Sequence, residues 1–379
     1  MVKGGMTAKA HAYLDYNATT PVLNEVALAV TAALGSFGNP SSMHGPGRQA
    51  RAAVEEAREA VAALINAPAQ RVIFTSGGTE ANALALRGLA AAGECSAVLT
   101  SAAEHPSILA HVAEHDRIAV DKNGIIDLDA LERALKQRAA PVLIAVMFAN
   151  NETGVLQPVA EAVALARRYG ALIHCDAVQA PGKIATDMHD LGVDSVSLSA
   201  HKFGGIKGAG VLALRGGVEI AADMLGGGQE RRRRAGTENV PGIVGMGAAA
   251  RYAGRLLDGG SRVTELRDEL EAAVKSAAPQ ARIFGKDRPR LGNTSCISLP
   301  GISSETQVMR LDLAGVAVSA GSACSSGKIA PSHVLLAMGV DPHEAKSAIR
   351  VSLGWETTRA DTSRFLEVWL ALAAQFQDS

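Results

Sequence analysis

Short apolar runs alternate with amphipathic stretches of helical period between residues 55 and 215. This alternation predicts βα units arranged around a mainly parallel sheet. Several of the runs are apolar at both alternating positions, as expected for strands that helices cover on both faces. The expected strands are 71–76, 96–101, 141–149, 171–178, 195–200 and 210–214.

The rest of the chain predicts a second, smaller domain. Residues 225–242 are rich in Gly and Arg and break the alternation, so we expect them to form a long functional loop. After a helix-rich region, residues 280–379 predict an α+β unit that ends in helices over 332–338, 343–351 and 362–377.

The length of the chain supports this division, since 379 residues exceed the usual size of one compact core. We expect a large domain over residues 13–250 and a small domain over residues 251–379. Residues 1–12 are expected to be a lead-in that packs with the small domain.

Composition and charge argue against several functions. The 37 Lys and Arg residues balance 38 Asp and Glu residues, so we expect no bulk attraction to nucleic acid or to an anionic membrane. Aromatic residues make up 3% of the chain, too few for platforms that stack single-stranded bases. No apolar run approaches the ~18 residues of a membrane span. These features predict a soluble enzyme.

The four cysteines are Cys95, Cys175, Cys296 and Cys324, and they show neither zinc-site spacing nor a disulfide framework. The N-terminus lacks the apolar core of a signal peptide, so we expect a reducing, cytoplasmic location and no intrinsic metal. Cys324 lies among Gly, Ser and Ala, which favours an accessible, reactive thiol over a buried one. The other three fall in or beside strands and are expected to be small core residues.

Five candidate positions are expected just beyond the carboxyl ends of strands, where open α/β sheets bind ligands: Gly78–Thr79, Lys202, Asp176, His105 and Asn150. Gly78 and Thr79 begin a helix and can bind an anion through exposed amides, or simply form an N-capped turn. Lys202 follows a buried strand, where desolvation can make its amine nucleophilic, although a lone lysine at a strand end more often extends to water. Asp176 requires a partner, which a protonated pyridine nitrogen, a helix N-terminus or an ion pair can provide.

For other polar residues, a structural role is an alternative to a role in binding or catalysis. His105 can cover a flat ring or transfer protons, but a histidine after a strand is often structural. Asn150 belongs to a sequence typical of a turn. Arg350 in an apolar run suits capture of a substrate carboxylate, with a structural ion pair as the alternative. The tract 231–234 can be a solvated face, or can meet a phosphate or a partner subunit.

The motifs together resemble a known family. In order they are LDYNATTP, FGNPSSMHGPGR, TSGGTEANALAL, EHPS, NNETG, HCDAVQ, SLSAHKFGGIKGAG, AGTENV, SAGSACSSG and AIRVSLG. This series, from about Tyr13 to Leu353, resembles the pyridoxal phosphate-dependent cysteine desulfurases of the NifS/IscS type, in the class V aminotransferase family. The resemblance implies the α/β fold of PLP-dependent transferases of fold type I, which is aspartate aminotransferase-like. Its large domain has a mainly parallel seven-stranded sheet, and its smaller domain is α+β.

The resemblance also implies how pyridoxal 5'-phosphate is bound. Lys202 would hold it covalently, Asp176 would pair with its pyridinium nitrogen, and His105 would stack on the ring and assist proton transfer. The other cofactor-binding residues implied are Gly78, Thr79, Ser199 and His201 at the phosphate, Thr237 from the second subunit of a homodimer, Gln179 at the ring hydroxyl, and Asn150.

The implied reaction converts L-cysteine to L-alanine and a persulfide on Cys324, with the substrate carboxylate bound by Asn150 and Arg350. The sulfur would pass to an acceptor or iron–sulfur scaffold protein, and Cys324 could transiently share a cluster with that partner. A selenocysteine lyase or another class V enzyme is the alternative within the family. A non-catalytic cluster scaffold and a dinucleotide-dependent dehydrogenase are less favoured, because Lys202 and Asp176 are present and the GxGxxG fingerprint is absent.

Overall fold

The computed structural model describes residues 12–321 and 330–375. Within them the chain forms two compact units. Unit 2 comprises residues 19–151 and 155–258, and the described part of unit 1 comprises 12–18, 152–154 and residues from 259 onward. The boundary expected between residues 250 and 251 falls inside one continuous helix, α9 (Val240–Asp258).

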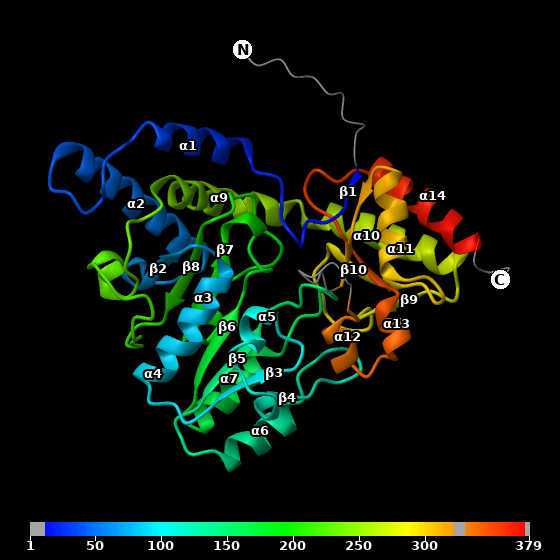
Figure 1. Cartoon of the computed structure of the whole chain (residues 1–379), viewed down its shortest axis with the longest axis horizontal. Helices are drawn as coiled ribbons and strands as arrows, with labels where there is room; N and C mark the ends of the chain where they lie inside the picture. The colour runs from blue at the N-terminus through cyan, green and yellow to red at the C-terminus, as the bar shows by residue number, and fades with distance from the viewer. Residues whose placement is uncertain (1–11, 322–329, 376–379) are drawn as a thin grey trace. The chain divides into compact units, whose positions relative to one another are not determined.

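Unit 2 is built on a seven-stranded sheet with the order β2-β8-β7-β6-β5-β3-β4 (Figure 1). Its strands from β7 to β4 are parallel, whereas β8 is antiparallel to both of its neighbours. The expected mainly parallel, seven-stranded sheet is therefore confirmed. The strands are β2 Val72–Thr75, β3 Val98–Ser101, β4 Arg117–Ile118, β5 Leu143–Met147, β6 Leu172–Asp176, β7 Ser195–Ser199 and β8 Gly210–Leu214.

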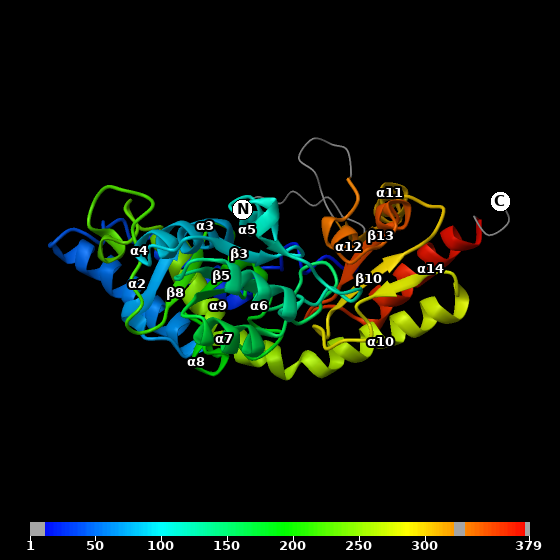
Figure 2. The same cartoon turned by 90° about the horizontal axis from the view of Figure 1, so that it is seen from below.

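Helices cover both faces of this sheet, because the strands are apolar on both (Figure 2). One face packs against α3 (Gly78–Leu84), its continuation as a short π-helix (Ala85–Leu89) and α5 (Pro106–Leu109). The opposite face packs against the remaining long helices of the unit. The other helices of unit 2 are α1 Asn24–Leu34, α2 Gly45–Leu64, α4 Ala90–Ala92, α6 Leu128–Gln137, α7 Val159–Arg168, α8 Met188–Leu191 and α9.

Unit 1 contains a four-stranded antiparallel sheet with the order β12-β13-β10-β9, and a parallel pair of β1 with β11. One face of the larger sheet packs against α10, α11 and α14 through an aliphatic and aromatic core. The elements are β1 Ala12–Tyr13, α10 Gly260–Ala277, β9 Arg282–Phe284, β10 Thr294–Ser298, α11 Ser304–Leu313, β11 Val316–Ala317, β12 Ser319–Ala320, α12 His333–Ala337, α13 Pro342–Lys346, β13 Ala348–Ser352 and α14 Arg359–Gln375.

The helix expected over residues 343–351 is wrong in its second half. Helix α13 ends at Lys346, and Ala348–Ser352 form β13, a central strand of the small sheet. The segment AIRVS places Ile349 and Val351 on the face that packs into the core, and this alternation of period two is the signature of a strand.

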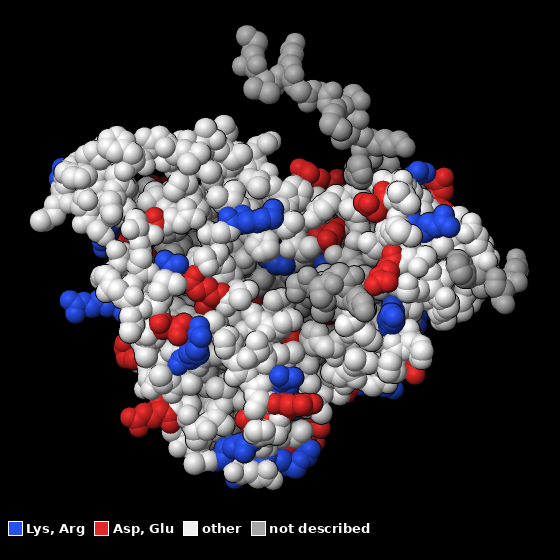
Figure 3. Space-filling model, in the orientation of Figure 1, with Lys and Arg blue, Asp and Glu red and all other residues white. Residues whose placement is uncertain are grey.

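The surface agrees with the balanced composition. On the face drawn in Figure 3, basic and acidic side chains are interspersed, without a large field of one sign. Among the described residues, no helix has both the length and the apolar character needed to cross a membrane.

A buried ion pair anchors the arginine-rich loop of unit 2. The carboxylate of Glu230 accepts hydrogen bonds from Arg58 Nη1 at 2.7 Å and Arg58 Nη2 at 2.9 Å, and from the backbone amide of Phe74 at 3.0 Å. Both side chains of the pair are almost fully buried. Glu230, Arg231 and Arg232 all have φ between 45° and 63°, a left-handed conformation that is strained for residues other than Gly. The ion pair therefore holds a strained segment in place.

We expect Glu230→Ala to lower the free energy of unfolding by about 3–5 kcal/mol, because the buried Arg58 would lose its buried partner and, among the described residues, keep only Glu55, which is partly exposed. Urea denaturation measures this loss. The control is Glu219→Ala, which removes an exposed partner of Arg71 and should cost less than about 1 kcal/mol. Equal losses in the two variants would contradict the anchoring role of Glu230.

Candidate active site

A stripe of polar side chains crosses the otherwise apolar interface between the sheet of unit 2 and helix α3. Ser195, Ser197 and Ser199 alternate along β7, and His174 and Asp176 alternate along the neighbouring strand β6. Each of these five residues is at most 7% exposed. The stripe ends at the carboxyl edge of the parallel strands, where ligands bind in open α/β sheets.

Asp176 is a buried carboxylate held by neutral donors. Its Oδ2 accepts a hydrogen bond from Asn82 Nδ2 at 2.7 Å, and its Oδ1 accepts one from the backbone amide of Val178 at 3.0 Å. Within the described ranges, no Lys, Arg or His forms an ion pair with it. Because a buried carboxylate is costly without a cation, this site suits a ligand that brings a positive charge.

His105 lies at the same edge, directly before α5. Its Nδ1 accepts from the backbone amide of Ser107 at 3.1 Å and lies 2.8 Å from the hydroxyl of Ser107. A ring nitrogen that accepts a backbone N–H carries no proton, so the ring is neutral with its proton on Nε2. Asn150 is also buried near the edge and donates from Nδ2 to the carbonyl of Ala103 at 3.0 Å.

Lys202 and His201 follow β7 in a short 3-10 helix, and both are half-buried. Burial, together with the charge of Lys202, lowers the pKa of His201 to about 4. Thr20 fixes the backbone here by donating to the carbonyl of His201. Gln179 is buried, and its Oε1 accepts a hydrogen bond from Lys183 Nζ at 2.6 Å.

The turn between β2 and α3 leaves no space for a side chain at Gly78. A Cβ there would come within 2.7 Å of Val178 Cγ2, and 3.4 Å from the Cβ of Ser199. Thr79 is exposed at the start of α3, beside Glu80, which pairs with Arg234 at 2.7 Å. Thr237 lines a cavity of about 160 Å³ next to the same turn.

Arg350 belongs to unit 1, on β13, where it is 6% exposed. Its Nη2 donates to Asp15 Oδ1 at 2.8 Å, so the ion pair weighed as the alternative is present. Glu152, on the same unit, is fully buried, and burial raises its pKa. Cys324 lies outside the described residues.

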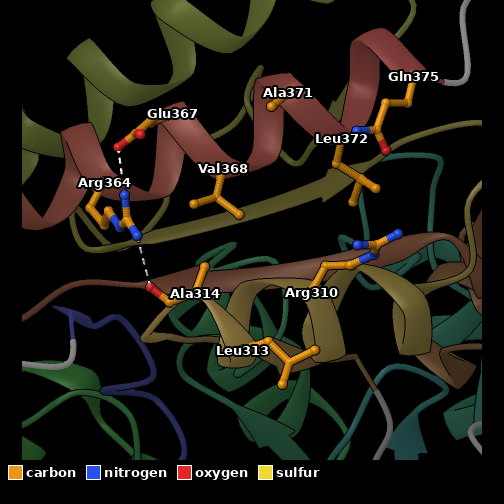
Figure 4. Close-up of a pocket in the computed structure, with 9 residues that line it drawn as sticks. All are labelled: Arg310, Leu313, Ala314, Arg364, Glu367, Val368, Ala371, Leu372 and Gln375. Carbon is orange, nitrogen blue, oxygen red and sulfur yellow. Dashed lines mark hydrogen bonds and ion pairs between the residues drawn. The ribbon is translucent and has the colours of Figure 1, made fainter. Parts of the chain in front are cut away.

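A surface groove of unit 1 involves none of the residues that the sequence indicated. It is lined by the side chains of α11 and α14, including Arg310, Leu313 and Leu372 (Figure 4). Arg364 bridges the groove by donating to Glu367 and to the carbonyl of Ala314.

The structure thus brings Asp176, His105, Lys202, Asn150 and the Gly78 turn to one edge of the sheet in unit 2. It also reveals three residues that the sequence analysis missed: Asn82, His174 and Ser107. For Asn82 and His174, the signal that could have found them is a polar residue at an apolar position of a helix or strand. Asn82 stands among Ala and Leu in α3, and His174 stands in the apolar strand β6.

The sequence and the fold are similar to those of known proteins. Residues 12–365 match the family described as aminotransferase class-V. A cysteine desulfurase of Cereibacter sphaeroides is 47% identical, with 94% of each chain covered. A cysteine desulfurase IscS of Dictyoglomus turgidum is 43% identical over 95% of this chain and 94% of its own. The crystal structure of a NifS-like protein from Rickettsia africae is 33% identical, with a TM-score of 0.88 over 96% of this chain and 99% of its own.

The buried His174 makes stability depend on pH. Burial lowers its pKa from 6.5 to about 4, so between these values the unfolded chain binds the additional proton. Stability is therefore lost as the pH falls through this window. Because of His174, the free energy of unfolding should fall by about 2 kcal/mol from pH 7 to pH 5.

The measurement is the free energy of unfolding at both pH values. We expect His174→Phe to lose this contribution to the pH dependence, whereas His189→Phe, which changes an exposed ring, should keep it. The same pH dependence in wild type and His174→Phe would show that His174 is not buried in its neutral form.

Proposed function

The chain belongs to the aminotransferase class-V family, and we propose that it is a cysteine desulfurase that uses pyridoxal 5'-phosphate to convert L-cysteine to L-alanine. The observation that carries the proposal is the convergence of Asp176, His105 and Lys202 at one sheet edge. A carboxylate for a ring cation, a neutral imidazole and an amine are the groups that this cofactor requires.

The residues fit the cofactor. Asp176 is a buried anion that lacks a cationic partner in the described chain, and a pyridinium nitrogen supplies that charge. Lys202 would bind the cofactor covalently, with His105 on the ring. The residues proposed for its phosphate and its remaining polar groups are Gly78, Thr79, Ser199, His201, Thr237, Gln179 and Asn150. When bound, the cofactor acts as an electron sink for the substrate's Cα.

The protein's own groups then have separate tasks. The amine of Lys202 would take the proton from the substrate Cα and return a proton later. Asn150 and Arg350 would bind the substrate carboxylate, for which the guanidinium of Arg350 supplies a positive charge and a planar set of N–H donors. The neutral ring of His105, with its proton on Nε2, would assist proton transfer.

Cys324 would receive the sulfur. Its thiolate attacks Sγ of the substrate, an S–S bond forms, and the Cβ–Sγ bond breaks with its electron pair staying on the substrate carbon. Protonation of that carbon completes alanine, and Cys324 keeps the sulfur as a persulfide. A sulfur-acceptor or iron–sulfur scaffold protein would then take it. The three described cysteines are free thiols, which suits a reducing cytoplasm.

The functional test is mass spectrometry of the Cys324 peptide after brief incubation with L-cysteine, with alanine measured in parallel. We expect one added sulfur on Cys324 in the wild type, and none on Cys95. Cys324→Ser should bind the cofactor yet release no alanine, whereas the control Cys95→Ser should behave as wild type. Lys202→Ala should form neither product. Normal alanine release by Cys324→Ser would refute the persulfide step.

We also propose that the protein is a homodimer. Unit 2 exposes large apolar side chains along and after α1: Leu28, Leu34, Phe37 and Met43 are 69–89% exposed. Such a concentration of exposed apolar residues is typical of an interaction surface. Thr237 would then reach the cofactor of the second subunit.

The charge-introducing change Phe37→Asp should shift the protein to monomers in sedimentation velocity, because it puts a carboxylate into a contact that excludes water. Leu313→Asp is the matched control, since Leu313 is 75% exposed on α11 of unit 1. A wild-type protein that sediments as a monomer at micromolar concentration would contradict the dimer.

A further inference from the structure

A continuous chain of hydrogen bonds runs through the buried stripe of unit 2. Ser195 Oγ lies 2.8 Å from His174 Nδ1, and His174 Nε2 lies 3.1 Å from Asn82 Oδ1. Asn82 Nδ2 in turn lies 2.7 Å from Asp176 Oδ2. All four residues are at most 7% exposed, so water does not compete for these contacts.

The direction of each hydrogen bond in this chain is fixed. Asn82 Oδ1 can only accept, so His174 Nε2 must carry the proton. His174 is neutral because burial lowers its pKa to about 4, and its Nδ1 therefore accepts from the hydroxyl of Ser195. A rotated Asn82 would set its carbonyl oxygen against Asp176 and its amide hydrogens against His174. Only one orientation of the amide is satisfied.

The amide group of Asn82 serves two residues of the site at once. One N–H donates to Asp176 Oδ2, and the other donates to Ser107 Oγ at 2.9 Å. Because Ser107 Oγ accepts this bond, its own hydrogen is available to His105 Nδ1 at 2.8 Å. A single side chain on α3 thus connects the carboxylate and the imidazole proposed to contact the cofactor ring.

We propose that Asn82 is a positioning residue that orients Asp176 and His105 toward the cofactor, and that the Ser195–His174 pair fixes the orientation of Asn82. The inference rests on the proposed function, because it concerns how the same site holds its cofactor. Donation from Asn82 Nδ2 holds Oδ2 of Asp176 in position, so the carboxylate is oriented before a cationic ring binds.

The first test is the dissociation constant of pyridoxal 5'-phosphate, measured by titration of the full chain after removal of the cofactor. Asn82→Ala removes a hydrogen bond to a charged group, so the dissociation constant should rise about ten- to a hundredfold. Ser195→Ala removes the hydrogen bond to His174, which is between neutral groups and does not involve Asn82 directly. It should raise the dissociation constant about two- to tenfold.

Ser197→Ala is the matched control. Ser197 lies on the same face of β7, between Ser195 and Ser199, and is equally buried. Its hydroxyl makes no hydrogen bond within the described residues. Both substitutions remove a hydroxyl from the same strand, but only Ser195→Ala breaks a hydrogen bond, so Ser197→Ala controls for the lost volume. We expect Ser197→Ala to bind the cofactor as tightly as the wild type.

The second test does not depend on the cofactor. Nitrogen-15 NMR of labelled histidine should show His174 as the Nε2–H tautomer in the wild type from pH 6 to pH 8. Asn82→Ala, which removes the acceptor of the Nε2–H group, should mix the tautomers, whereas Ser197→Ala should not.

The outcomes separate two failures. A wild type that binds pyridoxal 5'-phosphate while both Asn82→Ala and Ser195→Ala bind it equally tightly would overturn the positioning role alone. A protonated His174, or its Nδ1–H tautomer, would also overturn that role. A wild type that binds no pyridoxal 5'-phosphate would overturn the proposed function, and this inference with it.

Discussion

The burial of Asp176 is the constraint on which the site of unit 2 depends. A carboxylate between a sheet and a helix loses its hydration, so the fold must supply donors in its place. Asn82 and the amide of Val178 do so, and Asn82 is itself fixed by His174. Polar residues, Asn82 on α3 and His174 on β6, therefore occupy positions that would otherwise be apolar. These donors are neutral, which leaves the negative charge available for a ligand.

The sequence predicted the parts of this arrangement that follow local rules. Strand ends place polar residues at the carboxyl edge of a parallel sheet, and this was enough to locate Asp176, Lys202 and His105. The sequence analysis did not identify Asn82 and His174, because their role depends on a contact between a helix and a strand. The two residues are 92 positions apart in the chain. Residues 343–351 show a similar limit, because the helical residues of α13 are followed at once by AIRVS, a short segment that forms β13 by pairing with two neighbouring strands. Motif order, through the family resemblance, supplied the fold type and the chemistry that periodicity alone could not.

Asp176 and Arg350 are both buried charges, but their partners differ in kind. In unit 2 the carboxylate of Asp176 has neutral donors, whereas in unit 1 Arg350 has a protein partner, Asp15, at 2.8 Å. A buried guanidinium with an anionic partner is stable without a ligand. In the described part of the chain, Asp176 therefore obtains a counterion only when a cationic ligand binds, whereas Arg350 already has one in Asp15.

The loop around Glu230 has a consequence for recognition. Its left-handed residues would relax if they were free, yet the buried bond to Arg58 keeps them in place. The conformational entropy of this segment is thus lost during folding, before any other molecule arrives. A molecule that meets the exposed Arg231 and Arg232 encounters a surface whose backbone is already set, so association there does not require the loop to become ordered.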